Sequence, residues 1–185
     1  MPLGRLQRPD PNEYNPRFHA EISTVPDSAD FAALMRRNAG ETIVFIRSDF
    51  GEEHAGVRYA PDKWTVREVV GHLSDVERVL SYRALCIARG DLTVLPGFDE
   101  NAYVPAADFE RRTLQSVLDE FVAVRGATAA FVESLTDELA ARRGNVSSGT
   151  MTVRALLYLI AGHELHHVRL LRERYLPCVA VAATR

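Results

Sequence analysis

Apolar side chains recur at spacings of three and four residues along four stretches of the chain, and this period is typical of amphipathic helices. The stretches cover residues 28–49, 65–88, 109–135 and 153–175. The third stretch places its apolar residues and one threonine on one side of a helix, at Leu114, Val117, Leu118, Phe121, Val124, Thr128, Phe131 and Leu135. No pattern of period two persists over more than a few residues. The sequence therefore predicts an all-α protein built as a four-helix bundle.

Local signals mark where some of the predicted helices begin and end. Thr65 and Glu68 have the spacing of a capping box, in which each side chain bonds a backbone N–H of the other residue. Gly90 ends the same helix. We expect the last helix to end near Tyr175, because Pro177 has no backbone N–H and cannot continue a regular helix.

The chain divides into three parts. Residues 1–26 contain five prolines, which predicts an extended N-terminal arm rather than a helix. Residues 27–177 contain the bundle, and residues 178–185 are expected to form a short tail. The connection over residues 89–108 is long for a bundle and is interpreted as a crossover connection. Its chain-breaking residues are Gly90, Pro96, Gly97 and Pro105.

The composition is that of an ordinary globular domain, with 185 residues of which 46% are hydrophobic and 25% charged. The net charge of −3 gives no sign of a nucleic-acid partner. No apolar run approaches the roughly 20 residues that span a bilayer, and the N-terminus lacks the apolar centre of a secretory signal. The two cysteines, Cys86 and Cys178, form no disulfide framework. We therefore expect a cytoplasmic protein with no membrane partner.

Three of the six histidines are predicted to point into the bundle core. With His163 set to zero on a helical wheel, His167 lies about 40° away, inside the apolar stripe. His72 lies inside the stripe of the second predicted helix, with Val76 about 40° away. His166 falls at about −60°, at the edge of its stripe. The pattern indicates three imidazoles directed at one interior.

Two explanations fit histidines in a core. A single buried histidine is usually satisfied by a hydrogen bond, but two imidazoles one turn apart need several polar partners. Neutral imidazole is a good ligand for zinc, nickel, copper or iron, so we expect His72, His163 and His167 to bind one divalent metal ion. Residues 163–167 also match the HExxH motif of zinc peptidases. No histidine follows His167 as a third downstream ligand, which disfavours a peptidase.

Two segments of the chain resemble the DinB-like superfamily. Residues 59–77, YAPDKWTVREVVGHLSDVE, look like the signature of that family's second helix, and residues 161–171, AGHELHHVRLL, are similar to its last helix. Residues 96–101, PGFDEN, are a weaker match. The resemblance extends over roughly residues 28–176.

This resemblance implies a bundle of down-up-up-down arrangement that binds a divalent metal ion, nickel or zinc in many members. The family's ligands match His72, His163 and His167, whereas His166 is not at a ligand position. Characterised members include low-molecular-weight-thiol S-transferases and a mycothiol-dependent isomerase. The resemblance therefore implies a metal-dependent enzyme for a small-molecule substrate, with a low-molecular-weight thiol as a candidate cosubstrate and a homodimer as the expected assembly.

Three functions stay open on the sequence: a thiol S-transferase acting on small electrophiles, a metal-dependent hydrolase, and a non-catalytic metal-binding bundle that dimerises. Three protein ligands would leave open coordination positions, as in catalytic sites. Glu164 is a candidate catalytic base or a partner of an imidazole, and equally a candidate ion-pair partner of Arg83. Glu77 and Asp75 are predicted to be surface charges, and Trp64 to be a structural residue at the helix start.

Overall fold

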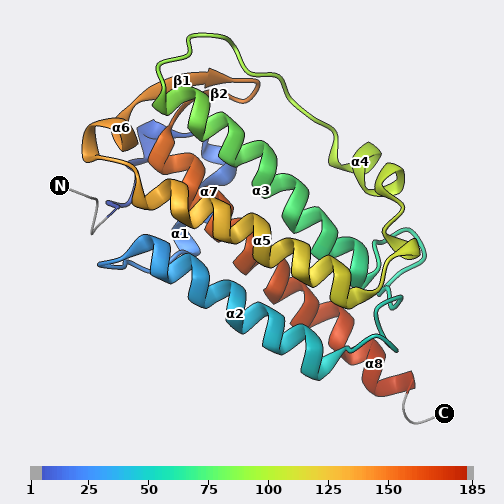
Figure 1. Ribbon diagram of the computed structural model, residues 1–185. Helices are drawn as coiled ribbons and strands as arrows, with labels where there is room; N and C mark the ends of the chain where they lie inside the picture. Colours follow the sequence, from blue (N-terminus) through green and yellow to red (C-terminus); the bar gives the residue numbers. More distant parts are fainter. Residues whose placement is uncertain (1–5, 183–185) are drawn as a thin grey trace.

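Four long helices form the core of the fold, and the computed structural model describes residues 6–182, with side chains up to residue 179. The helices are α2 (Phe31–Asp49), α3 (Val66–Ala88), α5 (Leu114–Glu133) and α7 (Val153–Leu170). Figure 1 shows α2 and α7 running in one direction and α3 and α5 in the opposite direction. This is the down-up-up-down arrangement, so the predicted bundle is confirmed. None of the helices in residues 6–182 is long and apolar enough to cross a membrane.

Side-chain caps set the starts of these helices. The Thr65 hydroxyl accepts a hydrogen bond from the Glu68 backbone N–H, and the Glu68 carboxylate accepts one of 2.7 Å from the Thr65 N–H, as the capping box predicts. Asp30 and Thr113 cap α2 and α5 with their side chains. Both helices therefore begin later than predicted, because a capping residue has non-helical backbone angles.

α3 packs against two helices of the bundle, α5 and α7. Because two of its flanks are covered by other helices, α3 buries residues beyond its single apolar stripe. Even the charged residues Glu77 and Arg83 are buried, with 2% and 7% of their surface exposed. α3 therefore connects the two halves of the core.

The connection between α3 and α5 crosses the outside of the bundle (Figure 1), which lets two parallel helices follow one another. It contains α4 (Glu100–Ala107) and a 3-10 turn at Phe109–Arg111. Phe109 is buried against Gly71 of α3, where a Cβ atom would overlap the phenyl ring. The predicted crossover is therefore present, and a glycine on α3 makes room for it.

A small β-hairpin precedes α7, where the sequence predicts only a loop over residues 136–151. Its antiparallel strands are β1 (Arg143–Val146) and β2 (Gly149–Thr152), and the short helix α6 (Asp137–Ala141) comes before them. Four residues per strand are too few for a period-two pattern to stand out. The hairpin leads directly into α7, because the Thr152 hydroxyl caps that helix.

The N-terminal segment is folded, which corrects the prediction of an extended arm over residues 1–26; residues 1–5 lie outside the described part. It forms 3-10 turns at Pro11–Glu13 and Pro16–Phe18, followed by the helix α1 (His19–Thr24). Each 3-10 turn begins with a proline. At the first position of a helical turn the backbone N–H has no acceptor within the turn, so proline loses no hydrogen bond there. The segment packs against α7, and the Tyr158 hydroxyl donates a 3.1 Å hydrogen bond to the Leu6 carbonyl.

The last helix continues past the predicted stop before Pro177. A π-helical turn at Leu171–Tyr175 follows α7, and α8 (Leu176–Ala182) follows the turn. The wider turn shifts the hydrogen-bond pattern by one residue, so that the chain stays helical although Pro177 has no N–H. The expected tail over residues 178–185 is therefore helical as far as Ala182, and residues 183–185 lie outside the described part.

Candidate metal centre

The three predicted metal ligands meet between α3 and α7. The Nε2 atom of His163 lies 3.1 Å from Nε2 of His72 and 3.1 Å from Nε2 of His167. One nitrogen from each ring lies within 4.8 Å of the nitrogens of the other two. Two nitrogens bound at about 2.1 Å to a tetrahedral ion would be roughly 3.4 Å apart. The observed spacing therefore fits three imidazoles around one ion.

Helix geometry brings these rings together. His163 and His167 are one turn apart on α7, so their side chains leave the helix in nearly the same direction. Their ring centroids are 4.5 Å apart, and that of His72 on α3 lies 4.9 Å from the His163 centroid. His72 faces them because α3 packs along α7. Two rigid helices, rather than a loop, thus hold the site.

Burial keeps the three imidazoles neutral at neutral pH. It lowers the pKa of His72 to about 4. It also lowers the pKa of His167 to about 3, with a further contribution from the charges of the neighbouring histidines. The pKa of His163 is well below its ordinary value for the same reasons. A neutral imidazole offers its lone pair to a metal without first losing a proton.

The hydrogen-bonding capacity of the cluster also points to a metal ion. A neutral imidazole has one N–H donor and one acceptor nitrogen, so Nε2 of His163 cannot satisfy two neighbouring Nε2 atoms at once. The Nδ1 atom of His167 is buried and has no hydrogen-bond partner among the described residues. Three imidazole nitrogens are a donor set that suits divalent transition metals such as zinc, nickel, copper or iron.

Trp64 covers one side of His72, with 4.6 Å between the ring centroids. Its backbone carbonyl accepts a 2.9 Å hydrogen bond from the hydroxyl of Tyr175, at the end of the π turn. Burial raises the pKa of that hydroxyl, which therefore stays protonated as a donor. Trp64, expected to be only structural, thus also forms a wall of the site.

A cavity of about 360 Å³ opens onto the histidines, within the size range of small-molecule sites. All three predicted ligands line it, and His166 lines it without joining the cluster. The walls come from α3, α7, the N-terminal segment, the crossover connection and the hairpin. Outside the histidines, the wall residues are Arg17, Phe18, Glu21, Trp64, Val76, Leu80, Arg83, Gly97, Phe98, Glu100, Ser147 and Leu159.

The family model of the DinB superfamily matches residues 47–171, which include all three histidines of the cluster. The chain belongs to the DinB superfamily. The resemblance seen in the two sequence segments is therefore confirmed. Among curated proteins, none matches the sequence.

Two solved structures share the fold of this DinB bundle. YfiT from Bacillus subtilis, described as "a probable metal-dependent hydrolase with an unusual four-helix bundle topology", superposes with a TM-score of 0.65 at 21% identity, covering 76% of this chain and 86% of YfiT. The mycothiol-dependent maleylpyruvate isomerase superposes with a TM-score of 0.57 at 11% identity. This match covers 82% of the present chain and 59% of the isomerase. Both likenesses concern the fold.

The DinB bundle holds Glu164, the candidate base, in its core rather than in the cavity wall. The Glu164 carboxylate is 1% exposed and accepts hydrogen bonds of 2.7 Å from the Thr42 hydroxyl and 2.6 Å from Arg125. Of the two alternatives for Glu164, the structure shows an ion pair, but the partner is Arg125 and not the Arg83 that the sequence offered. The prediction that Glu77 is a surface charge is wrong, because its buried carboxylate binds Arg125.

Sequence reasoning missed the other charged residues of the cavity. Arg83 was considered only as a partner of Glu164; its guanidinium instead donates a 2.6 Å hydrogen bond to the Pro96 carbonyl. Arg17 and Glu21 belong to the N-terminal segment. No periodic signal in that proline-rich stretch could place them beside α7.

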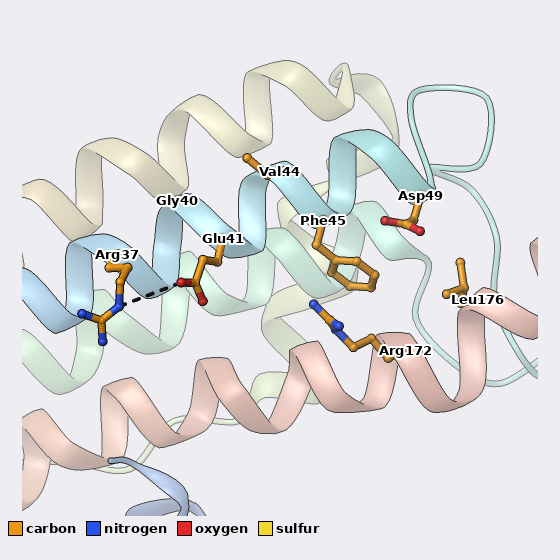
Figure 2. Close-up of a pocket in the computed structure, with 8 residues that line it drawn as sticks. All are labelled: Arg37, Gly40, Glu41, Val44, Phe45, Asp49, Arg172 and Leu176. Carbon is orange, nitrogen blue, oxygen red and sulfur yellow. Dashed lines mark ion pairs between the residues drawn. The ribbon is translucent and has the colours of Figure 1, made fainter. Parts of the chain in front are cut away.

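A second, larger hollow of about 770 Å³ lies between α2 and the region where α7 continues into α8 (Figure 2). The Arg172 guanidinium lies 4.4 Å from the centre of the Phe45 ring there, and Arg37 pairs with Glu41 at 3.9 Å. Its described lining residues include no histidine or cysteine. The histidine cavity is therefore the stronger candidate for a functional site.

Proposed function

We propose that His72, His163 and His167 hold one divalent metal ion, nickel or zinc, and that the protein uses it to add a low-molecular-weight thiol to a small electrophile. The observation that carries the proposal is the convergence of three neutral imidazole nitrogens at a cavity large enough for a small molecule. When bound, the ion would lower the pKa of a thiol or a water molecule at an open coordination position.

The ligand count favours a catalytic centre over a structural one. The described residues bring three side chains to the cluster, and no cysteine or carboxylate joins them. Structural metal sites are usually closed by four protein ligands, whereas catalytic sites keep a position open. All three imidazoles line the cavity, so a small molecule would approach the open position of the ion from that side.

The chain's own residues would hold the reactants and exclude water. Val76, Leu80 and Leu159 give the cavity an apolar wall close to the histidines, and Trp64 closes the side next to His72. A lower local dielectric strengthens the attraction between a positive centre and a developing anion. The fold shared with a mycothiol-dependent isomerase supports a thiol as one reactant.

Hydrolysis is the second candidate, supported by the fold shared with YfiT and by one carboxylate. Glu21 lies in the cavity wall, and its Oε2 atom is buried without a hydrogen-bond partner among the described residues. In this second candidate function Glu21 accepts a proton from water. Glu164 is not available for that role, because its carboxylate is bound in the ion pair with Arg125. Substitution of Glu21 by glutamine would then abolish hydrolysis and spare thiol addition.

The test follows the consumption of several biological thiols in the presence of small electrophiles. Metal-loaded protein should consume thiol faster than metal-stripped protein and faster than His72→Ala. His54→Ala is the matched control, because His54 bonds the Phe50 carbonyl at 2.8 Å outside the cavity wall. Equal rates in all samples would refute the transferase proposal and favour the hydrolase. Light scattering of the same samples would test the homodimer, which stays a prediction, as does the cytoplasmic location.

A further inference from the structure

Arg83 is a buried charge without a counter-charge. Only 7% of its surface is exposed, yet no carboxylate among the described residues is close enough to form an ion pair with it. The guanidinium bonds the neutral Pro96 carbonyl and lies 5.7 Å from the centre of the Phe98 ring. Buried charges are normally paired, because an isolated one loses its hydration without compensation.

Arg125 shows how the same protein treats a buried arginine that has a structural role. Arg125 is 2% exposed and bonds the carboxylates of both Glu77 and Glu164. Arg83 is also buried, although less deeply, and has none of these partners. The difference between them is that Arg83 lines the cavity of the three histidines.

A second cation adds to the imbalance. Arg17, from the N-terminal segment, lines the same cavity and makes no ion pair with any described residue. Burial and the nearby charge of Arg17 lower the pKa of Arg83. Glu21 and Glu100 also belong to the wall, but neither lies within ion-pair distance of the two guanidinium groups. The two arginines thus repel each other, and no carboxylate of the described residues pairs with either of them.

We propose that Arg17 and Arg83 bind a carboxylate of the substrate, so that the small molecule reacting at the histidines carries an anionic group at its far end. The inference rests on the proposed function, because it assigns a chemical class to the molecule that enters that site. A carboxylate would supply the counter-charge missing at Arg83, and guanidinium groups bind carboxylates through paired hydrogen bonds.

The geometry also sets the shape of that molecule. His72 and Arg83 are eleven residues apart on α3, which is about 16 Å of helix. Arginine side chains on helices lean towards the N-terminus, so the guanidinium lies roughly 10 Å or more from the imidazoles. Val76 and Leu80 line the cavity between them. The substrate should therefore be elongated, with an apolar middle, a reactive end and a carboxylate end.

Binding can be measured without turnover, because Trp64 is the single tryptophan of the chain and lines the cavity. Its fluorescence should be titrated in zinc-loaded and metal-stripped protein with two pairs of probes. One pair is 6-mercaptohexanoate and its amide, and the other is 6-chlorohexanoate and its amide. We expect at least one acid to bind about tenfold or more tighter than its amide. The pair that shows this preference identifies whether the thiol or the electrophile carries the anion.

Three substitutions locate the preference. Arg83→Met should abolish the preference for the acid, Arg17→Met should reduce it, and Arg83→Lys should keep part of it. Arg89→Met removes an equal charge from an exposed position at the end of α3 and should leave the preference intact. A structural role for Arg83 would make Arg83→Met less stable. We expect its melting temperature to be unchanged or raised, because a buried unpaired charge is removed.

The outcomes separate this inference from the proposed function. Equal binding of acid and amide in both pairs would overturn the inference, whatever the enzymatic activity. The same holds if Arg83→Met keeps the preference or melts well below the wild type. A preference for the acid without any metal-dependent thiol consumption would count against the transferase alone and leave the anion site standing.

Discussion

Replacing Arg125 by methionine should destabilise the bundle strongly. Arg125 donates to both carboxylate oxygens of Glu77 at 2.8 to 3.1 Å, to Glu164 at 2.6 Å and to the Met35 carbonyl at 3.0 Å. Burial lowers the pKa of Arg125, but the two carboxylates outweigh that effect and raise it, so the guanidinium stays charged. Methionine has nearly the same length and no charge. The substitution therefore leaves two acidic groups buried without a counter-charge, and Glu164 keeps only its hydrogen bond from Thr42.

The expected loss follows from that arrangement. Breaking a buried ion pair by removing one partner costs about 3–5 kcal/mol, because the remaining charge has neither water nor a counter-ion. The unfolding free energy of a whole domain is about 5–15 kcal/mol, so this loss is a large part of it. For a protein of this length the melting temperature should fall by roughly 6–20 °C.

Urea unfolding followed by circular dichroism measures the change. Arg36→Met is the control, because the ion pair of Arg36 with Glu133 has side chains 45% and 54% exposed and should contribute little. The triple variant with leucine at positions 77 and 164 and methionine at 125 should regain most of the loss, since no charge is then left unpaired. If Arg125→Met were as stable as Arg36→Met, the three buried charges would not stabilise the core and the reasoning would be wrong.

Three further predictions concern the metal site and the packing around it. His163→Ala should lose most of the bound metal and His166→Ala should keep most of it, as measured by elemental analysis after dialysis. Gly162→Ala should destabilise the protein by about 1–3 kcal/mol, because a Cβ atom there would overlap the backbone of α1. Gly126→Ala, where a Cβ atom meets nothing within 4 Å, should be neutral or stabilising by up to about 1 kcal/mol. Wild-type protein should be more stable than Glu13→Gln at neutral pH and should lose this advantage in acid, as urea midpoints would show.

The sign of the acid effect comes from the surroundings of Glu13. Burial raises the pKa of its carboxyl, but hydrogen bonds from Arg154 and Thr152 and the charge of Arg154 outweigh burial and hold it below the ordinary 4.5. A carboxyl group whose pKa is lower in the folded than in the unfolded protein stabilises the fold at pH values above its unfolded pKa. This contribution is lost as the pH falls through its folded pKa. A stability difference between the wild type and Glu13→Gln that increased at acidic pH would contradict this assignment of a lowered pKa to Glu13.

Equal metal content in the two histidine variants would contradict the assignment of His163, and not His166, as a ligand. Equal stability of Gly162→Ala and Gly126→Ala would show that α1 is not held against α7 at this point. Both variants of a pair make the same substitution, so a difference between them is caused by the position of the residue and not by its type.

The helices and the histidine cluster were predictable because they depend on local order. An imidazole at every fourth residue points the same way on any regular helix, and the box formed by Thr65 and Glu68 caps a helix without help from distant residues. His72 could be placed opposite the pair on α7 because its helix has an apolar stripe of its own. These features can be predicted from the helical repeat and from residues that are close together in the sequence.

The partners of the buried charges could not be predicted in the same way. A helical wheel gives the direction of a side chain but not the depth of its burial, and Glu77 becomes buried because α3 is covered on two flanks. Arg125 is far from Glu164 in the sequence, so only the assembled bundle, in which α5 and α7 each pack against α2 and α3, brings the two side chains together in the core. The N-terminal segment has no periodic pattern at all. Its place beside α7 depends on single contacts such as the hydrogen bond from Tyr158 to Leu6.

The folded N-terminal segment has a consequence for how this protein can change over time. The three histidines lie inside residues 47–171, the region that matches the superfamily, whereas Arg17, Phe18 and Glu21 lie before it. The candidate metal centre and part of the cavity wall beside it are thus encoded by separate stretches of the chain. Mutation or exchange of the first stretch can change the wall of the cavity while the three histidines stay in place. A chimaera that carries another relative's leading segment on this bundle would inherit a new selectivity from it.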